Sequence, residues 1–348
     1  MRYRDVCIEA VSYALPERVV SSLEIEGWLR PLYERIGLHE GRLELMSGIR
    51  ERRFWPAGTL PSEASAQAGR RALAAAGLVA GDVDCLINCS VSRDFVEPAT
   101  STAVHRLLAL GHHVLNFDIS NACLGMVSGV LMLANMVELG QIETGLAVCG
   151  ENGVPLVENT IRRLNADTSQ TRRSIKDQFA SLTIGSAAAA VVVRRLSKSR
   201  LGHRLLAAAH YADCSGNHLC QGDAGGGMTD GSAPVMATDS HELMVRGIAV
   251  AGHMWRKLKD VAAWTESTPD VICTHQVGKT HSELLYQSLG LDRAKDFSTF
   301  ERLGNCGSAS LPATCAMAAE AGRLRPGAKL ALLGIGSGIN CCGLAVQW

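Results

Sequence analysis

The feature that most constrains the fold is an internal repeat that spans much of the chain. The motif Asn121-Ala-Cys recurs as Asn305-Cys-Gly (305 − 121 = 184), and AVCG, ending at Gly150, recurs as ALLG, ending at Gly334 (334 − 150 = 184). Two glycines in each segment repeat at a similar offset (322 − 140 = 182 and 327 − 145 = 182). A repeat of this length predicts two similar halves, which we place at residues 1–195 and 196–348. Equivalent turns of the halves should face each other, which would bring Cys123 and Asn305 toward one centre.

Strand-like and helix-like segments alternate along most of the chain. Helices are predicted at 64–78, 124–140 and 282–290, and buried strands at 83–91, 115–120, 145–152, 187–193, 270–277 and 329–338. This alternation predicts an α/β protein whose sheets are covered by helices.

Charge and cysteine usage exclude several classes. Lys+Arg and Asp+Glu are equal at 34 each, so nothing indicates nucleic acid or an anionic membrane as a partner. The N-terminus has scattered charges, and no run of 18 or more apolar residues occurs, so we expect a cytoplasmic protein without a membrane span. None of the 12 cysteines forms a C-x-x-C pair, and the group Cys214, His218 and Cys220 lacks the usual ligand spacing. We therefore expect no metal.

Three residues stand where chemistry is favoured. Cys123 precedes an apolar segment predicted to be a helix, and the unpaired N–H groups and dipole of a first helical turn stabilise a thiolate. His275 ends the apolar strand of VICTHQVGK, and Asn305 sits in the glycine-bracketed turn LGNCGSAS. Singly, each also fits a structural role. A Cys, a His and an Asn at corresponding turns of a repeat form a more specific set.

The glycine-rich run GIGSG (334–338) lies between two strand-like segments. A dinucleotide-binding loop opens a helix, so this run does not match one. Its glycines instead allow backbone N–H groups to point at a developing oxyanion.

Five motifs together resemble the thiolase superfamily, in particular its β-ketoacyl-ACP synthase III branch: GIRERR (48–53), NACLG around Cys123, THQV with His275, GNCGSASLP with Asn305, and the terminal GIGSGIN. The resemblance covers essentially the whole chain and implies a five-layered αβαβα sandwich of two duplicated halves that works as a homodimer. It implies that Cys123 accepts the acyl group and that the N–H groups of Cys123 and Ser337 form an oxyanion hole. His275 and Asn305 would donate hydrogen bonds to the thioester carbonyl of the second substrate. No cofactor is implied, and acyl-CoA or acyl-ACP would be the substrate.

Departures from the branch bear on the subtype. Gly334 stands where thiolases that condense without decarboxylation carry a basic cysteine. SVSRDFVEPATS (90–101) closely resembles the olefin-pathway acyl-CoA condensing enzymes, which implies that Glu97 reaches into the partner's site and removes an α-proton. From the residues alone, Glu97 fits equally well a loop carboxylate paired with Arg93.

The segment after His275 also departs from the branch. HQVGKT replaces the usual HQANLR, so the contacts to the carrier must differ. Arg50 and Lys279, together with Arg52 and Arg53, are candidates for contacts to the CoA phosphates.

We therefore expect a ping-pong acyltransferase that loads an acyl group onto Cys123. A second fatty acyl-CoA would then condense with it without loss of carbon dioxide, giving a 2-alkyl-3-ketoacyl thioester. Removing a proton α to a thioester requires a desolvated base, whereas decarboxylation of a malonyl group does not. Three alternatives stay open: a decarboxylating synthase that uses malonyl-ACP or malonyl-CoA, acyl transfer to an alcohol or amine, and a non-catalytic subunit that shapes a partner's site.

Overall fold

The computed structural model describes residues 1–222 and 235–348. The turn-rich composition of residues 214–234 predicts a long loop, and most of that segment lies outside the described residues. Nine strands of this part form one mixed sheet. In spatial order they are β11 (Val271–Thr274), β12 (Lys329–Gly336), β13 (Asn340–Gln347), β8 (Arg204–Ala212), β1 (Val6–Ala14), β7 (Ala187–Arg195), β6 (Thr144–Glu151), β4 (Cys85–Asn88) and β5 (Leu115–Asp118).

The two sides of this sheet repeat one pattern. β4 and β6 run parallel, and β7 and β1 follow antiparallel. On the other side β11 and β12 run parallel, and β13 and β8 follow antiparallel. β5 lies parallel beside β4, and an isolated parallel bridge between Ile272 and Asp296 occupies the matching place beside β11. The sides join where β1 meets β8, with Cys7 paired to Arg204. The boundary at residue 195 stays a prediction.

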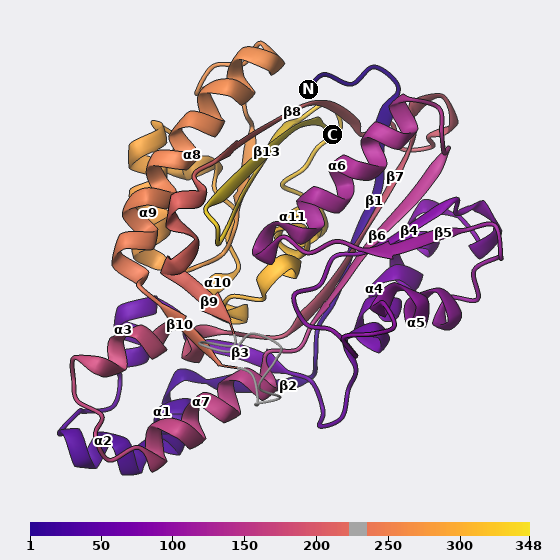
Figure 1. Cartoon of the computed structure of the whole chain (residues 1–348). Coiled ribbons are helices and arrows are strands. Elements are labelled where there is room, and N and C mark those ends of the chain that lie inside the picture. Colours follow the sequence, from indigo (N-terminus) through magenta and orange to yellow (C-terminus); the bar gives the residue numbers. More distant parts are fainter. Residues whose placement is uncertain (223–234) are drawn as a thin grey trace.

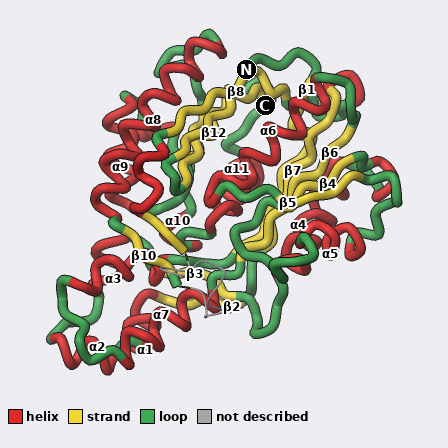
Figure 2. The backbone as a smooth tube through the Cα atoms, in the orientation of Figure 1, coloured by secondary structure: helices red, strands yellow, loops and turns green. Residues whose placement is uncertain are grey.

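Helices cover the sheet on its outer faces and fill the space between its two sides (Figures 1 and 2). α4 (Pro61–Ala76) and α5 (Thr100–Leu107) flank one outer face, and α8 (Ser240–Ala262) and α9 (Lys279–Leu289) flank the other. α6 (Gly125–Glu138) and α11 (Ser310–Glu320) lie between, in an apolar core that both sides of the sheet share. The expected αβαβα order of layers is thereby confirmed.

A smaller group of elements forms a separate apolar core beside the sandwich. Its elements are β2 (Arg18–Ser21), α1 (Ser22–Trp28), α2 (Arg30–Ile36), α3 (Arg42–Ser47), β3 (Glu51–Phe54), α7 (Val154–Ala166) and the 3-10 helix η3 (Ser174–Thr183). The short strands β9 (Cys220–Gly222) and β10 (Met236–Thr238) pair on either side of the gap in the description, and α10 (Phe300–Leu303) precedes Asn305. Within the described residues, none of the helices has both the length and the apolar character that a membrane crossing requires.

The first turn of α6 packs so closely on neighbouring backbone that only glycine fits there. A Cβ on Gly125 would lie 2.2 Å from the carbonyl oxygen of Cys89, the residue that follows β4. Because backbone cannot swing aside as a flexible side chain can, this contact sets how far α6 can approach the sheet.

This packing predicts that substitution by alanine has opposite effects on stability at two glycines. Gly125→Ala should lower the free energy of unfolding by about 1–3 kcal/mol, because the added methyl group overpacks the contact with Cys89. Gly27→Ala is the matched control, since Gly27 is an exposed residue of α1 whose Cβ would meet nothing within 4 Å. It should raise stability by about 0.5–1 kcal/mol. Denaturant midpoints measure both, and equal midpoints would contradict the packing described.

Candidate active site

Cys123 lies in a tight turn that leads directly into α6. The turn is the 3-10 helix η2 (Ala122–Leu124), which follows the end of β5. Ala122 has a φ of 45°, a left-handed conformation that costs a residue with a Cβ about 1–2 kcal/mol. The side chain of Asn121 donates to Ser128 Oγ at 2.9 Å and so ties the turn to the helix. The predicted position at the start of a helix is therefore present.

The predicted stabilisation of a Cys123 thiolate is wrong for the free protein. Burial, and to a lesser extent the carboxylate of Glu151 and the nearby Cys220, together raise the pKa of the Cys123 thiol to about 12. The N–H of Cys123 itself acts in the opposite direction but does not compensate. The resting side chain is a thiol, because desolvation outweighs the helix terminus.

The turn that carries Ser337 adjoins the Cys123 turn. It connects β12 to β13, and a Cβ on Gly336 would lie 3.3 Å from the backbone nitrogen of Leu124 and 3.4 Å from the carbonyl oxygen of Asn121. Asn340 Nδ2 donates to Asn121 Oδ1 at 3.4 Å from the other side of the turn. Glycine at 336 thus permits the close approach of backbone that an oxyanion hole requires.

Asn305 reaches the same place from the second half of the chain. Its backbone N–H donates to Thr183 O at 3.0 Å, and its carbonyl oxygen accepts from Gly185 at 2.9 Å. Its side-chain Oδ1 accepts from the backbone N–H of Gly307 at 3.0 Å. The amide oxygen is thereby engaged within the turn, which directs the Nδ2 donor away from Gly307.

The turn of Asn305 also contacts the start of α6. It continues into the 3-10 helix η8 (Gly307–Ala309), where Ser308 Oγ accepts from the backbone N–H of Met126 at 2.7 Å. One of the unpaired N–H groups of the α6 terminus is thus satisfied by the other half of the chain. The elements of Cys123, Ser337 and Asn305 meet at this point.

His275 follows β11, one strand away from the turn of Ser337. Its backbone N–H donates to Leu333 O of β12 at 2.9 Å, and the side chain is buried. Burial, and to a lesser extent the neighbouring His281, together lower the pKa of His275 to about 3. The imidazole is therefore neutral at physiological pH, with one donor and one acceptor nitrogen.

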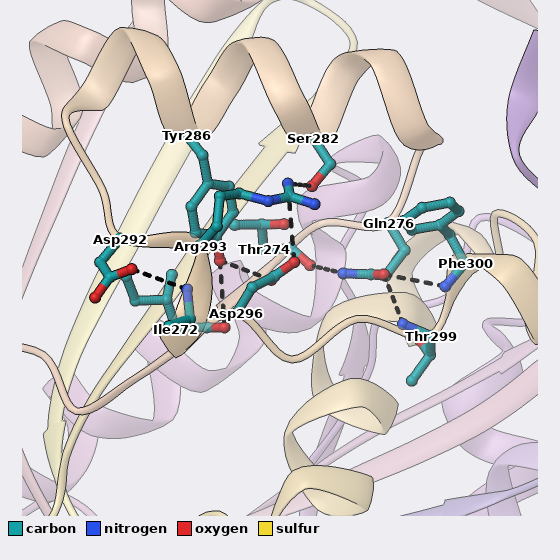
Figure 3. Close-up of polar contacts among 11 residues, drawn as sticks. Ile272, Thr274, Gln276, Ser282, Tyr286, Asp292, Arg293, Asp296, Thr299 and Phe300 are labelled. Carbon is teal, nitrogen blue, oxygen red and sulfur yellow. Dashed lines mark hydrogen bonds and ion pairs between the residues drawn. The ribbon is translucent and has the colours of Figure 1, made fainter.

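Gln276 fixes the backbone that carries His275 (Figure 3). Its Nε2 donates to Thr274 O at 2.6 Å, and its Oε1 accepts from the N–H groups of Thr299 and Phe300 at 2.8 and 3.1 Å. Farther along the strand, Ile272 O accepts from the Tyr286 hydroxyl of α9 at 3.5 Å, and the same hydroxyl donates to Asp296 Oδ1 at 2.7 Å. The end of β11 is thus tied both to α10 and to α9.

Arg50 and Lys279 lie near each other at the surface, but Arg52 does not join them. A Cβ on Gly48 would lie 2.8 Å from Cβ of Lys279, and the backbone N–H of Arg50 donates to Glu301 O at 2.9 Å. The exposed Arg50 side chain forms an ion pair with Glu301 at 3.6 Å.

Two of the four predicted phosphate ligands are engaged elsewhere. Arg52 is fully buried and donates to Ser22 Oγ and Leu182 O, and burial lowers its pKa to about 10. Arg53 donates to Pro16 O at 3.0 Å. Arg52 is therefore unavailable to CoA, which corrects that part of the prediction.

Glu97 lies at the tip of a loop that two carboxylates hold at its ends. At one end Val91 and Ser92 donate their N–H groups to Glu151 at 2.9 and 3.0 Å. At the other end Thr100 and Ser101 donate to Asp118 at 3.0 and 2.8 Å. Between these ends Glu97 is exposed in the single chain, and its two preceding neighbours, Phe95 and Val96, are 60% and 69% exposed.

The alternative that paired Glu97 with Arg93 finds no support, since no ion pair joins these two residues in the part of the chain that the structure describes. In the same part of the chain, no three His, Cys, Asp or Glu side chains gather closely enough to hold a metal ion.

Sequence reasoning missed Glu151. It ends β6, and its carboxylate is buried between the Glu97 loop and the turn of Asn305. The available signal was a charged residue after the apolar run GLAVCG, at the end of a predicted strand.

Comparison with known proteins agrees with this arrangement. Residues 117–214 match the family model described as 3-oxoacyl-[acyl-carrier-protein (ACP)] synthase III, and residues 260–348 match the model of its C-terminal part. An acyl-CoA:acyl-CoA alkyltransferase of Shewanella oneidensis is 36% identical over 351 residues, and one of Xanthomonas campestris is 34% identical over 348 residues. Both matches cover 100% of each chain.

A solved structure extends the likeness to three dimensions. Cerulenin-bound OleA of Xanthomonas campestris has a TM-score of 0.94 at 34% identity, and the match covers 100% of this chain and 98% of that one. Solved variants of OleA include substitutions of one glutamate, one cysteine and one histidine. In OleA that glutamate precedes the cysteine by 26 residues, and here Glu97 precedes Cys123 by the same number (123 − 97 = 26).

The fold and these matches define an acyltransferase of the thiolase superfamily. Within it, the chain belongs to the 3-oxoacyl-ACP synthase III-like family, together with the acyl-CoA:acyl-CoA alkyltransferases of Shewanella and Xanthomonas.

The protonated state of Cys123 predicts how the free protein reacts with iodoacetamide. Because the pKa of the thiol is raised to about 12, its thiolate fraction grows about tenfold for each pH unit between pH 7 and 9. The alkylation rate of Cys123, followed by peptide mass spectrometry, should rise by the same factor as the thiolate fraction. The exposed Cys214 is the internal control. A rate that levels off below pH 8 would contradict the burial described.

Proposed function

We propose that the protein joins two fatty acyl-CoA molecules head to head, without loss of carbon dioxide, and releases a 2-alkyl-3-ketoacyl thioester. The observation that carries the proposal is the loop of residues 91–100, which is fixed at both ends and holds Glu97 outward. The glutamate-to-cysteine spacing shared with OleA and the names of the full-length relatives support it. The reaction draws on no cofactor beyond the CoA of its substrates, and we place it in the cytoplasm.

In the first half-reaction Cys123 Sγ attacks the thioester carbonyl of one acyl-CoA. A carbon–sulfur bond to Cys123 forms, the bond to the CoA sulfur breaks, and the departing CoA thiolate takes up the proton that Cys123 loses. The neutral imidazole of His275 has one donor and one acceptor nitrogen, so we propose that it passes this proton on in a concerted step without becoming an imidazolium. Backbone N–H groups of Cys123 and Ser337 would stabilise the oxyanion.

In the second half-reaction Glu97 removes the α-proton of a second acyl-CoA. His275 and the Nδ2 group of Asn305 donate hydrogen bonds to the enolate oxygen, and the α-carbon attacks the acyl group on Cys123. The new carbon–carbon bond forms as the Cys123 thioester breaks, and the proton that Glu97 removed passes to the sulfur, which restores both the Cys123 thiol and the Glu97 carboxylate. An apolar cavity of about 20 Å³, lined in part by Met126 and Val127 of α6, lies in the shared core, and we propose that the acyl chain bound to Cys123 extends toward it.

A second copy of the chain would complete this site. A base that abstracts such a proton needs a desolvated setting, but Glu97 is exposed in the single chain. The exposed Phe95 and Val96 suit burial against a partner, which would carry Glu97 into the partner's site. Arg50 and Lys279 lie near each other at the surface and would contact the phosphates of CoA.

Glu97→Gln should separate the two half-reactions. The amide preserves shape but cannot take the α-proton, so condensation should fall by about a hundredfold or more. Acylation of Cys123, measured as the added mass of the intact protein, should proceed as in the wild type. Condensation that persists within about threefold of the wild-type rate would remove Glu97 from the mechanism.

Mixed dimers test whether Glu97 acts across the interface. Cys123→Ala and Glu97→Gln chains, co-expressed with different tags and purified through both, form dimers in which one site combines an intact Cys123 with the partner's Glu97. Such dimers should show about half of the wild-type condensation rate, although each variant alone is inactive. Inactive mixed dimers would mean that Glu97 serves the cysteine of its own chain.

A further inference from the structure

We infer that Glu151 is a positioning residue that links three parts of the site: the loop of Glu97, the turn of Asn305 and the start of α6. The inference rests on the proposed function, since it assigns Glu97 and Asn305 to the condensation step. Glu151 itself does not touch substrate in this account.

The contacts of Glu151 join segments that are far apart in the sequence. Oε1 accepts from the backbone N–H groups of Val91 at 2.9 Å and Ser308 at 3.2 Å, and Oε2 accepts from Ser92 at 3.0 Å. Ser308 Oγ in turn accepts from the N–H of Met126, in the first turn of α6. One side chain thus sets the separation between a loop of the first half and a turn of the second.

The chemistry of these contacts calls for a carboxylate. Four donors face its oxygens, the three backbone N–H groups and the Cys149 thiol at 3.7 Å, and a carboxylate can accept from all of them. An amide in the same place would turn an NH₂ group toward at least one N–H donor. Burial raises the pKa of Glu151 above its usual value, and the N–H groups of Val91, Ser92 and Ser308 oppose that rise by stabilising the carboxylate.

The same charge acts on the nucleophile. Glu151 raises the pKa of the Cys123 thiol, and the only other group that does so through its charge in the described structure is Cys220. Around Glu151 itself stand the thiols of Cys89, Cys149 and Cys306. Burial is the main reason that Cys123 is protonated at rest, and Glu151 adds to that effect while it holds the groups of the second half-reaction in place.

These two effects predict that loss of the charge raises the reactivity of the Cys123 thiol and lowers the rate of condensation. In Glu151→Gln, the rate of iodoacetamide alkylation of Cys123 at pH 8 should rise about threefold or more, and acyl loading should be retained. Condensation should fall about tenfold or more, because the loop of Glu97 and the turn of Asn305 lose their shared anchor. If Glu151 only stabilised the fold, the rates of acyl loading and of condensation would fall by the same factor.

Two further variants separate charge from geometry. Glu151→Asp keeps the charge on a shorter side chain, so alkylation should match the wild type while condensation falls. Asp118→Asn loosens the other end of the Glu97 loop without touching the turn of Asn305, so it should lower condensation and leave alkylation unchanged.

The inference is overturned if alkylation of Glu151→Gln is unchanged or slower, if its loading and condensation fall by the same factor, or if Glu151→Asp condenses at the wild-type rate. The Asp variant keeps the test decisive should the Gln variant fail to fold. A wild-type protein that forms no two-chain product would refute the proposed function, whereas the alkylation rates would still test the effect of Glu151 on Cys123.

Discussion

The site depends on one backbone contact, the docking of the first turn of α6 against both halves of the chain. Gly125 lets the turn approach Cys89 on one side, and Gly336 lets the strand of the other half approach Asn121 and Leu124. Ser308 completes the contact by accepting the N–H of Met126. Because backbone, and not flexible side chains, makes most of this contact, the position of Cys123 relative to the turn of Ser337 has little freedom.

Burial leaves the nucleophile and its histidine uncharged at rest. It raises the pKa of the Cys123 thiol and lowers the pKa of the His275 imidazole, so neither carries a charge at neutral pH. Such a site suits apolar acyl chains, and it leaves proton removal to a base supplied from elsewhere. In the proposed reaction this base is the exposed Glu97, which lies on a loop that Glu151 and Asp118 anchor.

Much of the layered fold could be predicted from the sequence, because long apolar runs carry the signal of buried strands. Each of the six predicted strands is present, with ends within three residues of those in the structure, and the three predicted helices correspond to α4, α6 and α9. The small core was missed. A charge-rich segment such as 157–180 is typical of a solvated surface insertion, but here Val157 and Leu164 are buried against elements from the start of the chain.

The predictions about the site that were wrong concern properties that depend on contacts between residues far apart in the sequence. The chain order places Arg52 beside two other arginines, but its partners Ser22 and Leu182 come from elsewhere and bury it. The pKa of Cys123 depends on burial and on Glu151, which no local pattern reveals. The interface that would enclose Glu97 belongs to two chains, so neither the sequence nor the single chain contains it.

The central claim is that two whole acyl chains are joined without a malonyl donor. Its most direct test is mass spectrometry of the product that the purified protein forms from a single fatty acyl-CoA, alone and with malonyl-CoA or malonyl-ACP. The account predicts a product from the acyl-CoA alone that keeps the carbons of both chains. A product that forms only with the malonyl donor, and is longer by two carbons after loss of carbon dioxide, would contradict it and indicate a chain-extending synthase.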